Sequence, residues 1–190
     1  MAGLRAALFA FLGLSAITLI TSCASIQKTA GRESKAVDDA ITQAQMHLAR
    51  GDYKKALEAY DDAYGDYPRS AELRGSYIRA GEQIKAAVDA AFQKKEFAEA
   101  GSGYTTLLKS TLTDKNFAGA LSFDTDHLNK RIQACSKGLL ETGLVQYRQG
   151  KLDQAISLWR KAITFDPDNK EAKDAISTAT VQLQNLKNIK

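Results

Sequence analysis

The chain has 190 residues, of which 25% are charged and 44% are hydrophobic, and its formal net charge is +4. These fractions are ordinary for one globular domain with appendages, and they exclude disorder of the whole chain. A net charge this small does not indicate nucleic-acid binding, so no nucleic-acid partner is expected. Two cysteines are too few for a disulfide-rich scaffold or a four-cysteine zinc site.

The first 22 residues carry one charge, Arg5, followed by an uncharged apolar run. This order is typical of a secretory signal peptide, and roughly 15 apolar residues fall short of the about 20 that a membrane-spanning helix needs. The run ends in Leu19-Ile20-Thr21-Ser22-Cys23, which resembles the lipobox of bacterial lipoproteins. The resemblance implies cleavage of residues 1–22 and acylation of Cys23, with each buried acyl methylene adding about 0.8 kcal/mol of anchoring. The alternative is an uncleaved membrane anchor in which the cysteine is incidental.

Residues 23–35 are predicted to form a lipidated tether in front of a helical domain at residues 36–190. Cys23 is followed by Ala24 and Ser25 rather than by an aspartate. This start of the mature chain resembles that of Gram-negative lipoproteins that are sorted to the outer membrane. The resemblance implies a protein of the cell envelope that is anchored to the outer membrane through its N-terminal lipid and faces the periplasm.

Beyond residue 36 the apolar residues recur at steps of three and four, and no sustained alternation of the strand type occurs. The two prolines of the chain, Pro68 and Pro167, both fall outside the periodic apolar stretches. These patterns predict an all-α fold.

Two segments around these prolines share the same kinds of residue at the same spacing, at an offset of 99 residues. Each has a small residue, a turn glycine, an alanine, an aromatic residue, a second alanine and a proline. In order, these are Ala44, Gly51, Ala56, Tyr60, Ala63 and Pro68 in the first segment, and Gly143, Gly150, Ala155, Trp159, Ala162 and Pro167 in the second. The pattern resembles the tetratricopeptide repeat, whose period of roughly 34 residues is about one third of the offset.

The resemblance gives each of these positions a mechanical role. The glycines allow the chain to reverse between two helices. Ala56 and Ala155, which follow them, are expected to lie where those two helices approach most closely. Tyr60 and Trp159 are expected to fill the gap between neighbouring hairpins, and each proline ends its helix. One departure is that His47 and Gln146 stand where the repeat prefers tyrosine; we interpret His47 as a packing residue.

A degenerate third copy lies between these segments, with Phe97, Ala100, Tyr104 and Leu107 at the same spacing and Lys94-Lys95-Glu96 in place of the turn glycine. Long helices are predicted over residues 71–94 and 125–149, the second capped by Asp124 or Thr125. Residues 112–124 are predicted to be a loop with a short helix around Phe117–Leu121. Residues 169–187 are predicted to form a capping helix, with a coiled-coil contact as the alternative. The predicted fold is therefore an α-solenoid of helical hairpins with two elongated helices and a C-terminal capping helix.

The sequence shows no pattern of a catalytic site, so no enzymatic activity, cofactor or metal is expected. Cys135 lies in a helical pattern and is interpreted as a small packing residue. His127 follows two aspartates, but the acids are better explained as a helix cap than as metal ligands. Gly101-Ser102-Gly103 lacks the lysine of a phosphate-binding loop, and no serine lies in a nucleophile elbow.

Repeat arrays of this kind bind other proteins in a groove lined by the first helix of each hairpin. Helical phase places Gln45 and Leu48 in that groove in the first repeat. In the last repeat the candidates are Leu140, Leu144, Tyr147 and Arg148, although the two leucines could instead be core and Arg148 a solvated charge.

These resemblances together imply an outer-membrane lipoprotein that acts as a protein–protein adaptor or assembly factor, for example of the pilotin type. The partner would be another protein, and the membrane would be contacted only through the lipid. One alternative is a cell-wall accessory protein that positions peptidoglycan enzymes. Another is an enzyme or small-ligand-binding lipoprotein whose site carries no familiar motif.

Overall fold

The computed structural model describes the backbone of residues 20–188 and the side chains of residues 31–188. The chain divides into two units, Met1–Ala36 and Val37–Lys190. The signal peptide predicted at residues 1–22 and the lipidation site predicted at Cys23 lie outside the described side chains, and both stay predictions. Within the described residues, no helix combines the length and the apolar character needed to cross a membrane.

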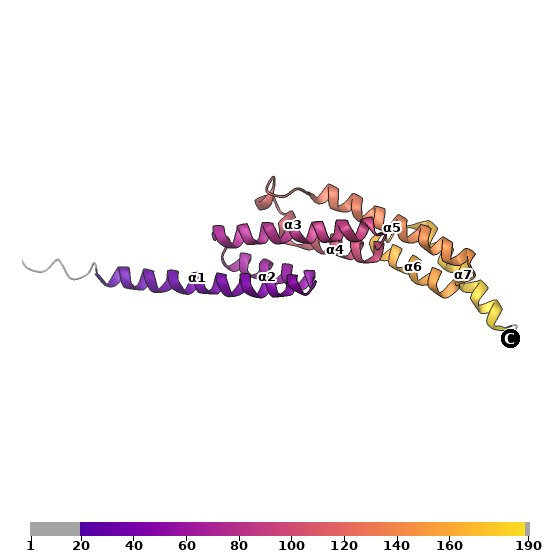
Figure 1. Ribbon diagram of the computed structural model, residues 1–190, viewed down its shortest axis with the longest axis horizontal. Helices are drawn as coiled ribbons and strands as arrows, with labels where there is room; N and C mark the ends of the chain where they lie inside the picture. The colour runs from indigo at the N-terminus through magenta and orange to yellow at the C-terminus, as the bar shows by residue number, and fades with distance from the viewer. Residues whose placement is uncertain (1–19, 189–190) are drawn as a thin grey trace, which may run out of the picture. The chain divides into compact units, whose positions relative to one another are not determined.

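The described residues form α-helices and two short 3-10 turns, without a strand, so the predicted all-α class is confirmed (Figure 1). From α2 to α7 each helix packs against the next along the chain, and α4 also contacts both α2 and α6. The helices are α1 (Ile20–Ala49), α2 (Tyr53–Asp66), α3 (Ala71–Gln93), α4 (Phe97–Lys109), α5 (Thr125–Arg148), α6 (Leu152–Phe165) and α7 (Lys170–Asn188).

Three of the connections between helices, those between α1 and α2, α3 and α4, and α5 and α6, use one backbone geometry. Gly51, Lys95 and Gly150 have φ angles of 76°, 64° and 74°, in the left-handed region. In each turn the N–H of the next residue donates to a carbonyl five residues earlier, for example from Glu96 to Ala91 at 3.0 Å. The degenerate middle copy therefore keeps the turn of the repeat although a lysine occupies the glycine position.

Small residues lie where the paired helices touch. Ala44, Ala56, Ala100 and Ala155 are completely buried. A Cβ atom added at Gly143 would collide with the indole of Trp159, whose Nε1 donates to the carbonyl oxygen of Leu140 at 3.0 Å. The glycine is therefore required by the size of the aromatic side chain packed on it.

The interior forms two apolar clusters. The larger extends from Val37 to Cys135, and the smaller links Leu139 with residues of α6 and α7, among them Trp159 and Ala179. Phe97 and Phe165 pack against both clusters. Cys135 is fully buried with a free thiol, which confirms its interpretation as a packing residue.

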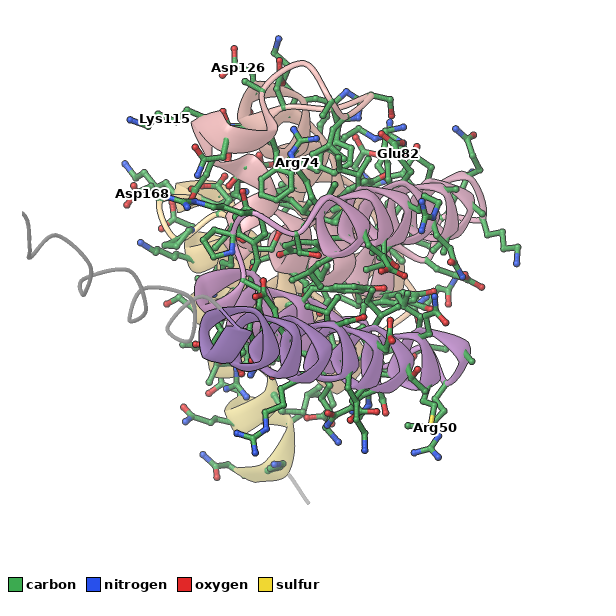
Figure 2. The ribbon with its side chains drawn as sticks, turned by 90° about the vertical axis from the view of Figure 1, so that its left-hand side faces the viewer. Arg50, Arg74, Glu82, Lys115, Asp126 and Asp168 are labelled. Atoms are coloured by element: carbon green, nitrogen blue, oxygen red, sulfur yellow. The ribbon has the colours of Figure 1, made fainter. Side chains whose placement is uncertain are left out.

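The insertion between α4 and α5 differs from its prediction. The expected short helix around Phe117–Leu121 is absent, and two 3-10 turns lie earlier, at Thr111–Thr113 and Lys115–Phe117. Gly119 has a φ of 73°, which interrupts any helix at that point. The side chains of Arg74 and Glu82 bind the insertion from α3 (Figure 2): Arg74 donates to the carbonyl of Asn116 at 3.1 Å, and Glu82 accepts from the Ser122 hydroxyl at 2.6 Å.

The long helices and the cap of α5 follow their predictions closely. α3 and α5 cover the two predicted long helices, and the Asp124 carboxylate accepts from the N–H of His127 at 2.7 Å. The Asn169 side chain caps α7 by accepting from the N–H of Ala172 at 2.9 Å. α7 covers α6 through buried Ala172 and Ala179, as a capping helix should.

Candidate functional site

A hollow of about 400 Å³ lies between α5 and α7 and is the best candidate for a functional site. Both walls are helical, so their side chains are held at fixed spacing. The floor is apolar, and the rim carries charges of both signs. Its lining residues are Gln133, Lys137, Leu140, Glu141 and Leu144 of α5, Trp159 of α6, Asp166 and Asn169 of the connection, and Glu171 and Ala175 of α7.

The apolar floor of the hollow is supplied mainly by two leucines of α5. Leu144 is 40% exposed, Leu140 is half-buried, and both lie on the face of α5 that lines the hollow. The indole of Trp159 borders the hollow but is only 2% exposed, and its hydrogen bond to the Leu140 carbonyl oxygen fixes it in place. Exposed apolar surface beside polar groups is typical of a protein contact site. The site is therefore suited to an aliphatic side chain of a partner.

The rim of the hollow is mainly acidic. Glu141, Asp166 and Glu171 contribute three carboxylates, and Lys137 is the one cation among the described lining residues. Within residues 31–188, none of these four groups takes part in an ion pair. The rim therefore has a net negative charge, opposite in sign to the net charge of the whole chain.

The predicted groove residues are distributed unevenly. Gln45 and Arg148 are exposed, but neither lines the hollow. Tyr147 is half-buried with its ring centroid 5.8 Å from that of Trp159. Leu48 was expected in the groove, but it is 8% exposed and belongs to the core, so it is not accessible to a partner. Leu140 and Leu144 do line the hollow.

The acidic rim was not predicted. Glu141 lies in α5, Asp166 follows α6 and Glu171 lies in the first turn of α7. Their signal in the sequence is faint, because they come from a connection and two helices that are neighbours only after folding.

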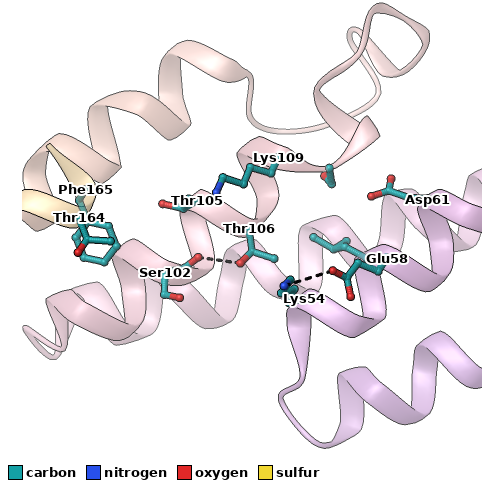
Figure 3. A pocket seen from close by; sticks show the side chains of 11 residues that line it. Lys54, Glu58, Asp61, Ser102, Thr105, Thr106, Lys109, Thr164 and Phe165 are labelled. Atoms are coloured by element: carbon teal, nitrogen blue, oxygen red, sulfur yellow. Dashed lines mark hydrogen bonds and ion pairs between the residues drawn. The ribbon is translucent and has the colours of Figure 1, made fainter. Parts of the chain in front are cut away.

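A second hollow, of about 410 Å³, lies across α2, α4 and α6 (Figure 3). Its polar groups are largely satisfied within the chain. Lys54 lies 3.6 Å from Glu58, and the hydroxyls of Thr105 and Thr106 donate to backbone carbonyls of α4 at 2.8 and 2.9 Å. Asp61 accepts from the N–H and the hydroxyl of Thr111 at 3.0 and 2.6 Å. This surface therefore offers fewer free groups than the hollow between α5 and α7.

A partly exposed polar cluster joins α3, α4 and α5. The Asp89 carboxylate accepts from Lys85 at 2.9 Å, from Arg131 at 3.3 Å and from the Tyr104 hydroxyl, and the Arg131 guanidinium lies 3.8 Å from the Phe92 ring centroid. Burial acts to raise the pKa of Asp89, but the Tyr104 and Lys85 hydrogen bonds and the two positive charges leave it below its ordinary value.

The cysteine and the two histidines of the described domain show no arrangement typical of a reactive site. Burial raises the pKa of the Cys135 thiol to about 11, so the thiol stays protonated and unreactive at neutral pH. His47 and His127 lie in separate helices, and the described residues contain no group of three His, Cys, Asp or Glu that could hold a metal ion.

Two family models described as tetratricopeptide repeat match residues 41–104 and 138–169. A crystal structure of the MamA protein is 15% identical, covers 77% of this chain and 81% of its own, and superposes with a TM-score of 0.24. No relative was matched among curated protein sequences.

Proposed function

The chain belongs to the tetratricopeptide repeat family, and we propose that it is an adaptor that binds another protein in the hollow between α5 and α7. Proteins of this family and fold are typically non-catalytic scaffolds with protein partners. The observation that carries the proposal is the pair of accessible leucines, Leu140 and Leu144, above the fixed indole of Trp159.

The adaptor is anchored in the cell envelope by lipid on Cys23 and faces the periplasm from the outer membrane, where it acts as an assembly factor of the pilotin type. What supports this part is the sequence of residues 1–25: a signal-like apolar run, a lipobox-like end and no aspartate after the cysteine. Two or three acyl chains would hold the domain stably at the membrane surface.

The binding surface is tested by placing a photocrosslinking amino acid at residue 144 in intact cells. We expect one defined protein to be crosslinked there, because Leu144 lines the hollow and is 40% exposed. The matched control is residue 181, an exposed valine of α7 that does not line the hollow. Equal crosslinking from both positions, or none from residue 144, would contradict the proposal.

The anchor is tested separately with Cys23→Ala. The variant has no thiol to acylate, so we expect it to remain unprocessed or to be released from membranes. Cell fractionation and mass spectrometry of the N-terminus measure this directly. Normal acylation of the variant and its recovery in the outer membrane would show that Cys23 is not the anchor.

A further inference from the structure

Resting on the proposed function, we infer the class of segment that the hollow between α5 and α7 receives. The partner presents an aliphatic side chain flanked by lysine or arginine. The apolar floor and acidic rim support the two halves of this inference independently. They can therefore be tested one at a time.

The apolar half follows from the floor. A hollow of about 400 Å³ is at the lower end of the roughly 300–1,000 Å³ typical of ligand sites, so it holds a few side chains rather than a domain. Leu140 and Leu144 are one helical turn apart on α5. On the facing α7, Ala175 has only a small side chain, which leaves room in the hollow. An aliphatic side chain that enters between these walls removes the exposed Leu144 surface from water.

The basic half follows from the rim. Glu141 on α5 and Glu171 on α7 stand on opposite walls, and Asp166 lies in the connection that leads into α7. Cationic side chains on both sides of the inserted residue meet carboxylates that no ion pair among the described residues engages. An acidic segment would face a carboxylate on each wall and only one cation, Lys137, among the described residues of the rim, which discriminates against the wrong partner.

The probes are three synthetic peptides of equal length and helix propensity. The first has leucines on one face flanked by lysines, the second replaces the lysines by glutamates, and the third keeps the lysines but replaces the leucines by alanines. Binding to the purified full chain is measured by fluorescence anisotropy against a blank of the same buffer. We expect the leucine–lysine peptide to bind about tenfold more tightly than either of the others, and to weaken as salt rises.

Two substitutions move the preference if the assignment is correct. Glu141→Lys with Glu171→Lys makes the rim basic, and we expect the variant to prefer the leucine–glutamate peptide. The same charge change at Glu58 and Asp62 on α2 is the control and should leave the preference as it is. Leu144→Ser should weaken the leucine–lysine peptide several-fold, whereas Val181→Ser, at a similarly exposed apolar position, should not.

Several results would overturn the inference. They are equal binding of the leucine–lysine and leucine–glutamate peptides, full binding of the alanine–lysine peptide, or a preference that the rim reversal does not change. Circular dichroism and a thermal melt establish that each variant is folded. If residue 144 still crosslinks one protein in cells while the peptides fail, the adaptor proposal stands and the partner chemistry assigned here is wrong. Failure of the crosslink contradicts the adaptor itself.

Discussion

The first hairpin, α1 with α2, and the last, α5 with α6, carry the same kinds of residue at the same positions but use them differently. Tyr60 stacks on Tyr77 of the next hairpin, with ring centroids 5.0 Å apart, and shares a hydrogen bond of 3.0 Å with Ser76. The insertion closes this junction further, because the Phe117 ring packs edge-on against Tyr77. Trp159 instead borders an open hollow between α5 and α7, with its indole almost completely buried. The aromatic position therefore closes the junction in the first hairpin and leaves a hollow beside it in the last.

The middle copy extends the comparison. Tyr104 occupies the position of Tyr60 and Trp159, yet its hydroxyl donates to a carboxylate, Asp89, and accepts from Arg131 at 3.1 Å. One position of the repeat thus bonds to a serine hydroxyl, to a charged cluster or to a backbone carbonyl. The repeat conserves the space that an aromatic ring fills, while the polar end of that ring adapts to local partners.

The largest effect is expected from Trp159→Ala. It removes the largest fully buried side chain and the hydrogen bond to Leu140, so the free energy of unfolding should fall by about 3–5 kcal/mol. Urea unfolding followed by circular dichroism measures the loss, with exposed Arg160→Ala as the control. A loss below 1 kcal/mol would mean that the last hairpin does not depend on the indole.

The second largest loss of stability is expected from Gly143→Ala, because the added methyl group collides with the Trp159 indole. Overpacking of this kind costs about 1–3 kcal/mol of unfolding free energy. Adding Trp159→Tyr recreates the alanine and tyrosine pair of the first hairpin. The double variant should therefore be more stable than the sum of the single losses predicts, in a double-mutant cycle by urea unfolding. Simple additivity would show that the two positions are not coupled.

Lys95→Gly should raise the stability of the middle hairpin, by giving its turn the glycine that the first and last hairpins have. Lys95 has a φ of 64°, in a region that costs a residue with a Cβ about 1 kcal/mol or more, while Gly51 and Gly150 avoid that cost. We expect up to about 1 kcal/mol of stabilisation in urea unfolding. Lys94→Gly is the control, since Lys94 has a φ of −77° and gains nothing from glycine. Equal effects at the two lysines would argue against relief of strain.

The smallest effect concerns the dependence of stability on pH in the alkaline range. Burial, and then the hydrogen bond to Asp89, raise the pKa of Tyr104 to about 12 from its ordinary value of 10. Above pH 10 the unfolded chain releases this proton before the folded chain does, so stability is lost as the pH rises through about 12. Tyr104→Phe should flatten this decline in urea midpoints measured from pH 9 to 12. An unchanged slope would show that Tyr104 titrates alike in both states.

Much of the fold was predictable because its signals are local. The glycine turns, the alanine contacts, the long helices and the cap at Asp124 each depend on residues within one hairpin or one helix turn. The insertion between α4 and α5 could not be predicted in the same way. Its turns are fixed by buried Leu112 and Phe117 and by the left-handed Gly119 rather than by a periodic pattern.

The candidate site was predictable only in part. Helical phase identified Leu140 and Leu144 as residues of one face, but it could not show which face another helix covers. The same reasoning therefore placed Leu48 in a groove, whereas the structure buries it. Glu141, Asp166 and Glu171 gather at one rim only through packing of α6 and α7, which spacing along the chain does not reveal.

Phe97 and Phe165 connect the two apolar clusters, and each ring rests where a glycine leaves room: Phe97 on Gly138 and Phe165 on Gly101. Because both rings belong to the two clusters at once, the packing of one cluster is coupled to that of the other within the compact unit Val37–Lys190. The smaller cluster, formed by α6, α7 and the second half of α5, lies beside the hollow. A partner bound there would raise the melting temperature of the whole unit, because ligand binding stabilises only the folded state that holds it.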